Sequence, residues 1–288
     1  MSRVWVAGEA LIDLVPSGGE RVAVVGGGPA NTAKALARLG IPTSFIGGIS
    51  SDEYGLQISR ELAEVDLSLS LRSDLPTAMA VVSLDAAGSA SYEFKLAGTA
   101  TFDFQRNWLP SGAPEVLHVG TLATIVEPGA SALWEWAADL GVPILFDPNI
   151  RPSVLADRGR YREIVVRWAS ISKVLKLSEA DFEWLGYESI GELLEIGPEL
   201  VVLTRGAEGI VGYSKAGTVS VPGVKVAVAD TVGAGDTVGA VLVEGIVKFG
   251  IKRLQDEALF EVLHRAARAA AITCSRVGAN PPRGDEID

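Results

Sequence analysis

The sequence is poor in the residues that form disulfides and metal sites. Cys274 is the only cysteine among 288 residues, so the chain forms no internal disulfide and its composition suits a reducing compartment. With His118 and His264 as the only histidines, a usual structural zinc site is excluded. His118 stands in a β-rich apolar run, which favours a packed core residue over a catalytic one.

Long apolar runs and basic charge are scarce as well. No segment is long and apolar enough to span a bilayer, and the run 4–15, interrupted by Glu9 and Asp13, lacks the basic leader of an export signal. We therefore expect a cytoplasmic protein. The formal net charge of -11 argues against binding nucleic acid or an anionic membrane, although local backbone N–H groups can still bind a small anion.

The remaining composition is that of a soluble globular protein. Hydrophobic residues make up 48% and charged residues 21% of the chain, which is ample for one core and predicts a single domain over 1–288. Short apolar strands alternate with helical patterns, as in an α/β protein with a mostly parallel sheet. The expected strands are 3–7, 43–49, 116–119, 144–146, 173–176 and 200–203, and the expected helices are 30–39, 54–63, 129–140, 161–169, 179–185 and 258–274.

Two segments break this alternation. The β-rich runs 77–84 and 89–96 flank Asp85-Ala86-Ala87-Gly88, which is typical of a hairpin, and 210–213 with 218–221 suggests a second hairpin. Together with a strand at 21–25, the first hairpin is expected to form a small antiparallel sheet, a lid of about 14–25 and 77–97 over a cleft. An antiparallel edge of the main sheet is the alternative.

A glycine turn beside an acid opens a long apolar helix near the end of the chain. It reads Asp230-Thr231-Val232-Gly233-Ala234-Gly235-Asp236-Thr237. The glycines place free N–H groups at the first helical turn, where an anion binds. A carboxylate at Asp236 is awkward there unless it accepts a proton from a group next to a phosphate. The pattern indicates a phosphoryl-transfer site, and an ordinary helix start is the alternative.

A second glycine cluster, Gly26-Gly27-Gly28-Pro29-Ala30-Asn31, also opens a helix. Upstream, Glu9 and Asp13 follow the first strand, where open α/β sheets bind ligands. Their apolar surroundings favour a functional role for Asp13, whereas Glu9 fits a solvated turn acid equally well. Carboxylate, amide and backbone groups of this kind bind polyols, so a sugar site is indicated.

A third glycine turn, Thr204-Arg205-Gly206-Ala207-Glu208-Gly209, follows a strand and indicates phosphate contacts. No G-x-x-x-x-G-K-[ST] run occurs, which excludes a Walker-type P-loop. The cluster at 26–28 does not complete G-x-G-x-x-G, because Asn31 occupies the last position. A nucleotide would therefore be held in another way.

The two longer motifs resemble the two signatures of the ribokinase/PfkB family of sugar kinases, in the same order and over nearly the whole chain. Segments 8–13, 146–152 and 177–181 are most similar to those of bacterial fructokinases. The resemblance implies a ribokinase-like three-layer α/β/α sandwich with a central, mostly parallel sheet and a small β-sheet lid. It also implies ATP, Mg²⁺ and transfer of the γ-phosphoryl group to a sugar hydroxymethyl.

The resemblance also implies roles for individual residues. Asp236 would be the general base, with an anion hole formed by the backbone of Gly233, Ala234 and Gly235. The implied sugar ligands are Asp13, Gly27, Gly28, Asn31 and Arg151. The implied nucleotide contacts are Lys176, Ser178, Thr204, Gly206, Gly209, Gly278 and Ala279. A monovalent cation such as K⁺ would lie near Asp230, the Val232 carbonyl and the backbone of Thr273, Arg276 and Gly278.

Two departures from the family pattern matter. The N-x-x-E element appears as Ser178-Glu179-Ala180-Asp181, so Asp181 takes the part of the acid that acts indirectly on Mg²⁺, with a shorter reach. Ala267 stands where many relatives have an asparagine near the adenine, which leaves nucleotide preference open.

We therefore expect an ATP-dependent sugar kinase, most similar to enzymes that convert D-fructose to fructose 6-phosphate. Ribokinase and 2-keto-3-deoxygluconate kinase remain alternatives, because lid side chains such as Tyr92 and Phe94 shape the sugar pocket and no motif fixes them. A sugar or nucleotide sensor that retains the fold is the alternative outside enzymes, and a sensor would not need Asp236. The expected partners are a sugar, ATP and a second copy of the chain paired through the lid.

Overall fold

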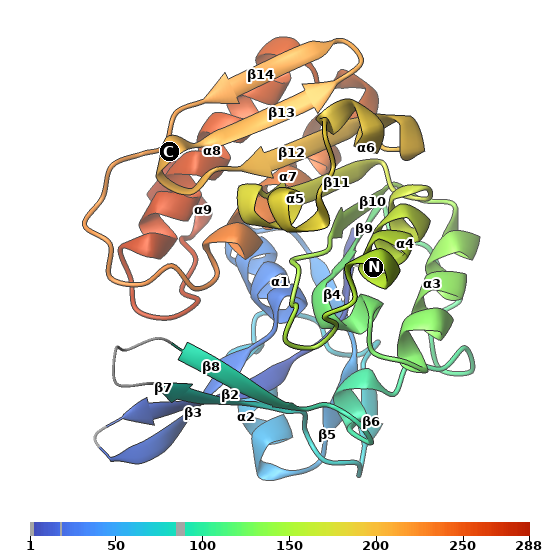
Figure 1. Cartoon of the computed structure of the whole chain (residues 1–288). Helices are drawn as coiled ribbons and strands as arrows, with labels where there is room; N and C mark the ends of the chain where they lie inside the picture. The colour runs from blue at the N-terminus through green and yellow to red at the C-terminus, as the bar shows by residue number, and fades with distance from the viewer. Residues whose placement is uncertain (1–2, 18, 85–89) are drawn as a thin grey trace.

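The computed structural model describes residues 3–17, 19–84 and 90–288. Figure 1 shows a large sheet with helices packed on it, and a smaller sheet that projects from the main body below it. A third sheet has two strands, β5 (Gly48–Ser50) and β6 (Leu71–Ser73). The large sheet and its helices carry most of the core, and the smaller sheet supplies one wall of the site.

The large sheet has eight strands in the order β14-β13-β12-β11-β10-β9-β1-β4. The six strands from β4 to β12 along this order are parallel, and β13 and β14 are added antiparallel at one edge. Strands β1, β9 and β10 are buried at every residue, as expected of strands covered on both faces. The strands are β1 Val4–Ala7, β4 Thr43–Ile46, β9 Val116–Gly120, β10 Ile144–Asp147, β11 Val174–Ser178, β12 Leu200–Thr204, β13 Ile210–Ser214 and β14 Gly217–Val221.

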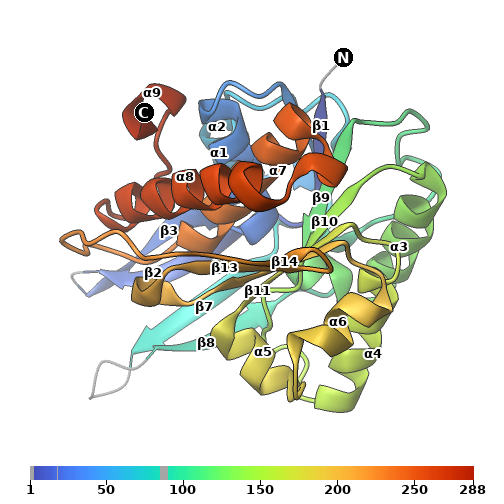
Figure 2. The ribbon, with the colours of Figure 1, turned by 90° about the horizontal axis from the view of Figure 1, so that it is seen from above.

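Helices cover both faces of this sheet, as the view from above shows (Figure 2). Because strand side chains alternate, Val4 and Val6 of β1 pack into one core while Trp5 and Ala7 pack into the other. The first core is covered by α1 (Gly28–Arg38), α2 (Glu53–Glu61), α7 (Ala234–Phe249) and α8 (Asp256–Cys274). The second is covered by α3 (Gly129–Leu140), α4 (Arg158–Ala169), α5 (Glu179–Leu185) and α6 (Ile190–Ile196).

This arrangement confirms the predicted ribokinase-like α/β/α sandwich. The short elements that complete it are α9 Gly284–Ile287 and the 3-10 turns η1 Ala100–Phe102, η2 Thr121–Thr124, η3 Gly206–Glu208 and η4 Ile251–Arg253.

The strand expected at 43–49 is divided: β4 ends at Ile46, and the chain leaves the large sheet to form β5, which pairs with β6. Neither the division nor β6 was predicted, because the partner strand lies far along the sequence. Among the described residues, no helix combines the length and hydrophobicity needed to cross a bilayer.

The smaller sheet has four strands in the order β3-β2-β7-β8, namely β2 Leu11–Ser17, β3 Glu20–Gly26, β7 Met79–Leu84 and β8 Ala90–Lys95. It is separate from the main sheet, so the edge-strand alternative is wrong. It is also not wholly antiparallel, because β2 and β7 run parallel with Ile12 opposite Met79. The expected hairpin turn at 85–88 lies outside the described residues. Strand β2 was not predicted, and it begins three residues before the expected lid segment.

Candidate active site

A cavity of about 560 Å³ opens where the carboxyl ends of the parallel strands face the smaller sheet. The first turns of α1 and α7 complete its wall. It brings together most of the residues predicted for the site: Asp13, Gly27, Gly28, Asn31, Arg151, Lys176, Ser178, Asp181, Thr204, Val232, Gly233, Gly235 and Asp236. Residues more than 200 positions apart in the sequence therefore share one cavity, because strand ends, the loops after them and the N-termini of helices converge on it.

Asp236 lies in the first turn of α7 and is only 8% exposed. Its Oδ2 accepts a hydrogen bond of 2.8 Å from Asn31 Nδ2. Its Oδ1 faces Gly28, where a Cβ atom would lie 3.2 Å from that oxygen and 2.7 Å from Thr121 Cγ2. Burial raises the pKa of Asp236 to about 6, and the hydrogen bond from Asn31 opposes this rise. The pKa of this carboxyl group is thus close to neutral pH, in the range expected of a general base.

The turn before α7 has the conformation that its glycines predict. Gly233 caps the helix with a φ of 79°, which favours glycine over residues with a Cβ atom. The first-turn N–H groups of a helix lack carbonyl partners within the helix, which leaves them to an anion. Ala234 is a partial exception, since its N–H donates a long bond of 3.3 Å to the Thr231 carbonyl.

Lys176 lies beside this turn and forms a buried ion pair with Asp147. Its Nζ is 2.6 Å from Asp147 Oδ2, and a Cβ atom at Gly235 would be 3.5 Å from the same Nζ. Burial acts to lower the pKa of Lys176, but the charge and hydrogen bond of Asp147 outweigh burial and the net pKa is raised. The ammonium group therefore stays charged next to the predicted anion hole.

Asp13 and Arg151 form the opposite side of the cavity. Asp13 projects from β2 of the smaller sheet, where burial raises its pKa to about 6 and the charge of Arg151 opposes the rise. The Arg151 guanidinium is exposed and donates to the carbonyls of Asn149 (3.3 Å) and Ile150 (3.0 Å). A carboxylate, a guanidinium and the Asn31 amide are suitable groups for the hydroxyls of a sugar.

Glu9 is a buried residue of the cavity wall, so the interpretation as a solvated turn acid is wrong. Its side chain is 1% exposed and accepts hydrogen bonds from the Thr121 hydroxyl and, at 3.0 Å, from the Ala123 N–H. Burial raises its pKa to about 7. Glu9 thereby fixes the turn that follows β9 against the end of β1.

Sequence reasoning missed Leu11, Thr121, Leu122 and Ser153, which line the cavity, and it gave no role to Asn149 and Thr231 although they lie in the segments 146–152 and 230–237. Thr121 follows β9 directly and Asn149 lies two residues after β10, and both have positive φ values, 54° and 39°. A polar residue just after a buried parallel strand was the available signal for both. His118, by contrast, is buried as predicted, and burial lowers its pKa to about 3.

Asp181 lines the cavity but is already bound to the protein. Its Oδ2 accepts from the Ser178 N–H (2.9 Å) and hydroxyl (2.6 Å), and its Oδ1 accepts from the Ile150 N–H at 2.9 Å. It thus caps α5 and ties the loop after β10 to it. No group of three or more acidic, histidine or cysteine side chains is arranged to hold a metal among the described residues.

A second cavity of about 610 Å³ adjoins the first and shares Thr204, Thr231 and Gly235 with it. Its wall is largely apolar, a suitable surface for a flat purine base. The lining includes Gly206 and Gly209 from the third glycine turn, Val224, Val226 and Val228 from the loop after β14, and Ala267, Ala270, Ala271 and Cys274 from α8. Ala267 thus faces the space where the resemblance places an adenine.

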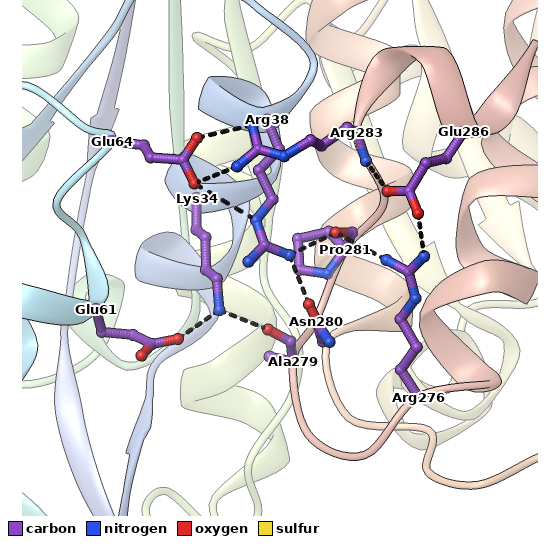
Figure 3. Close-up of polar contacts among 10 residues, drawn as sticks. All are labelled: Lys34, Arg38, Glu61, Glu64, Arg276, Ala279, Asn280, Pro281, Arg283 and Glu286. Atoms are coloured by element: carbon purple, nitrogen blue, oxygen red, sulfur yellow. Dashed lines mark hydrogen bonds and ion pairs between the residues drawn. The ribbon is translucent and has the colours of Figure 1, made fainter.

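The residues predicted near a monovalent cation lie together behind the α7 turn. Asp230 accepts from the N–H groups of Val232 (3.0 Å) and Gly278 (2.9 Å), and Thr273 is fully buried at the end of α8. Arg276, whose backbone is the predicted contact, directs its side chain toward Glu286 (Figure 3). Gly278 and Ala279 do not line either cavity, although Ala279 packs on Gly233.

The chain is similar to two known proteins, one of which is represented by two crystal structures. It is 38% identical over 254 residues to a fructokinase of Rhizobium leguminosarum bv. trifolii, covering 82% of this chain and 77% of the relative. It superposes on a fructokinase structure from Vibrio cholerae O395, in a fructose, ADP and calcium ion bound form, with a TM-score of 0.86, 28% identity and coverage of 100% of this chain and 98% of that one. A double mutant of that fructokinase, in a fructose, ADP and potassium ion bound form, matches with a TM-score of 0.85, 28% identity and coverage of 100% and 97%.

A family model agrees with these similarities. The model for the pfkB family carbohydrate kinases matches residues 1–285, which is almost the whole chain. The two glycine turns and the buried Asp236 lie at one cavity of the fold. The chain therefore belongs to the pfkB family of carbohydrate kinases.

Proposed function

We propose that this protein is an ATP-dependent fructokinase that converts D-fructose to fructose 6-phosphate. The observation that carries the proposal is the position of Asp236, a buried carboxyl group with a pKa near 6 that is oriented by Asn31 beside the first turn of α7. The choice of fructose is supported by relatives that bear the name fructokinase at 38% and 32% identity. Ribose and 2-keto-3-deoxygluconate, which the motifs leave open, are not favoured by these relatives.

In this proposal Asp236 accepts the proton of the sugar hydroxymethyl group as its oxygen attacks the γ-phosphorus of ATP. A bond forms between that oxygen and the γ-phosphorus, and the bond from the γ-phosphorus to the β,γ-bridging oxygen breaks, releasing ADP. The N–H groups of Gly233 and Gly235 and the Lys176 ammonium face the charge that develops on the transferred group. Asp13, Asn31 and Arg151 hold the other hydroxyls and orient the sugar.

The described residues suit the two ions implied by the family. Mg²⁺ bound with the nucleotide would neutralise phosphate charge. Asp181 Oδ1 accepts one hydrogen bond, so it can still accept a second from a metal-bound water. The oxygen atoms of Asp230, Val232, Thr273 and Gly278 are hard donors of the kind that K⁺ prefers, and a similar fructokinase was solved with a potassium ion.

We also make proposals on the domain organisation, the cellular compartment and the oligomeric state. We propose that residues 1–288 act as one unit in which the four-stranded sheet closes as a lid over the sugar. An ATP-consuming enzyme with a single cysteine fits the cytoplasm. Val22 and Val24 on the edge strand β3 are 49% and 41% exposed, which supports pairing of two copies through the lid.

Product analysis tests the proposal. The protein incubated with ATP, Mg²⁺ and D-fructose should give a phosphate monoester whose ³¹P and ¹³C spectra place it on C6. A phosphate on another carbon would contradict the assignment of the hydroxymethyl acceptor. The absence of a phosphate ester with every sugar tried would favour the sensor alternative.

A further inference from the structure

The loop between α8 and α9, residues 276–283, is fastened to helix α1 by two long basic side chains (Figure 3). Lys34 Nζ donates to the Ala279 carbonyl at 3.1 Å and also pairs with Glu61. Arg38 donates to Asn280 Oδ1 at 2.6 Å and to the Pro281 carbonyl at 2.7 Å. Both basic residues lie on the helix whose first turn carries Asn31 at the sugar side of the cavity.

The same loop contacts the turn that opens α7. A Cβ atom at Gly233 would lie 2.8 Å from the Ala279 Cβ, so the Ala279 methyl group packs directly on the predicted anion hole. The Gly278 N–H donates to Asp230 Oδ2 at 2.9 Å, and Asp230 Oδ1 accepts from the Val232 N–H. The loop therefore lies between α1 and the turn that would hold the transferred phosphoryl group.

Backbone hydrogen bonds do not fix the loop to α1. In the described chain the backbone bonds made by its N–H groups are local, from Arg276 to the Thr273 carbonyl (3.1 Å) and from Asn280 to the Gly278 carbonyl (2.8 Å). The link to α1 depends on Lys34 and Arg38, whose side chains are only 12% and 20% exposed. Shielding from water strengthens such charge-assisted bonds.

We propose that Lys34 and Arg38 are positioning residues for the anion hole, because they press the loop of Gly278 and Ala279 against Gly233. This proposal rests on the proposed function in that the Gly233 turn binds nucleotide phosphates. Without the Lys34 bond, the loop moves more freely and the Gly233 N–H groups are less well oriented. The effect falls on the nucleotide and leaves the sugar ligands of α1 in place.

Replacing Lys34 by methionine tests this role. The change keeps an unbranched side chain, and Glu61 is 45% exposed, so its unpaired carboxylate stays hydrated and folding is spared. We expect the Kd of AMP-PNP, a non-hydrolysable ATP analogue that keeps the third phosphate, to rise roughly tenfold by calorimetry together with the KM for ATP, the scale of one hydrogen bond from a charged donor. The Kd of D-fructose should stay within about twofold, and Lys34→Arg should restore most of the nucleotide affinity.

Lys248→Met provides the matched control. Lys248 forms an ion pair of 2.7 Å with Glu261 near the other end of α7, with 59% of its side chain exposed, and its loss should leave both affinities unchanged. An AMP-PNP Kd within twofold of the unmodified protein for Lys34→Met would overturn the proposal. Equal weakening of AMP-PNP and fructose would also overturn it, since that result indicates a loosened α1.

A milder variant covers the case in which Lys34→Met does not fold. Asn280→Ala removes the side-chain acceptor of Arg38 from the loop itself and should weaken AMP-PNP binding about threefold, and unchanged binding would overturn the proposal. Calorimetry with AMP-PNP needs no turnover. A protein that phosphorylates no sugar would therefore contradict the proposed function while the role of Lys34 is still decided by AMP-PNP binding.

Discussion

The Asn31 amide donates a 2.8 Å hydrogen bond to Asp236 across 205 residues of sequence. The bond joins the first turn of α1, at the sugar side, to the first turn of α7, at the phosphate side. It orients the carboxyl group and opposes the rise in its pKa that burial causes. The proposed chemistry depends on this contact, because it places a base where a sugar hydroxyl and a phosphoryl group meet.

Replacing Asp236 by asparagine should lower kcat by about 10²- to 10⁴-fold, the usual contribution of a general base. Asparagine keeps the size of the side chain, so D-fructose should still bind in calorimetry. Asp139→Asn is the matched control, because Asp139 is 69% exposed on the surface and pairs only with Arg106 among the contacts described. Turnover that survives the Asp236 change would remove this residue from its role.

The rate should depend on pH through the same carboxyl group. Asp236 must be ionised to accept a proton and its pKa is about 6, so log kcat should fall with a slope of one as pH drops below about 6. Asn31→Ala removes a bond that favours the ionised form, so the acid limb should move to higher pH. A limb that stays in place in this variant would show that another group controls the rate.

The same shift predicts how stability responds to pH. The pKa of Asp236 rises from 3.8 in the unfolded chain to about 6 in the folded protein, so folding favours its protonated form. The stability that protonation provides is present below about pH 4 and is lost as pH rises toward 6, by roughly 3 kcal/mol at most. Asp236→Asn should therefore be more stable than the unmodified protein at pH 7, and this gain in stability should be smaller at pH 5.

Urea unfolding of the two proteins at pH 5 and pH 7 measures this difference. Asp139→Asn should show no comparable gain between the two pH values. An Asp236→Asn protein that is equally stable to the unmodified protein at pH 7 would mean that the buried carboxylate is fully compensated by Asn31 and Lys176.

The four-stranded sheet should respond to sugar. Asp13 of β2 and Phe94 of β8 line the cavity, so closure over a bound sugar would order both strands. Backbone amides of β7 and β8 should exchange more slowly with D-fructose present, by mass spectrometry. Strand β14, at the far edge of the large sheet, is the internal reference. Equal protection of both regions would indicate general stabilisation without lid closure.

The site could be predicted largely because its glycines act locally. Gly27 and Gly233 have positive φ values of 107° and 79°, which favour glycine, so both positions are recognisable as turns in the sequence. Asp236 follows its turn by only three residues. A helix start and the charge beside it are set by neighbouring residues in the chain, so this motif could be recognised from the sequence.

The rest depended on contacts between distant segments. Strand β2 contains Pro16 and the polar Asp13, which obscured its strand pattern, and its parallel pairing with β7 is not encoded in either segment alone. The burial of Glu9 follows from the turn after β9 folding over it. The bonds from Lys34 and Arg38 to the loop 276–283 likewise join residues more than 240 positions apart.

The most direct test is a sugar panel in a coupled assay of ADP release. The protein, ATP and Mg²⁺ are supplied with D-fructose, ribose, 2-keto-3-deoxygluconate and glucose in turn, with Asp236→Asn as the blank. The account predicts the highest kcat/KM with D-fructose and ADP release that requires Asp236. A higher kcat/KM with ribose or 2-keto-3-deoxygluconate would contradict the fructokinase assignment.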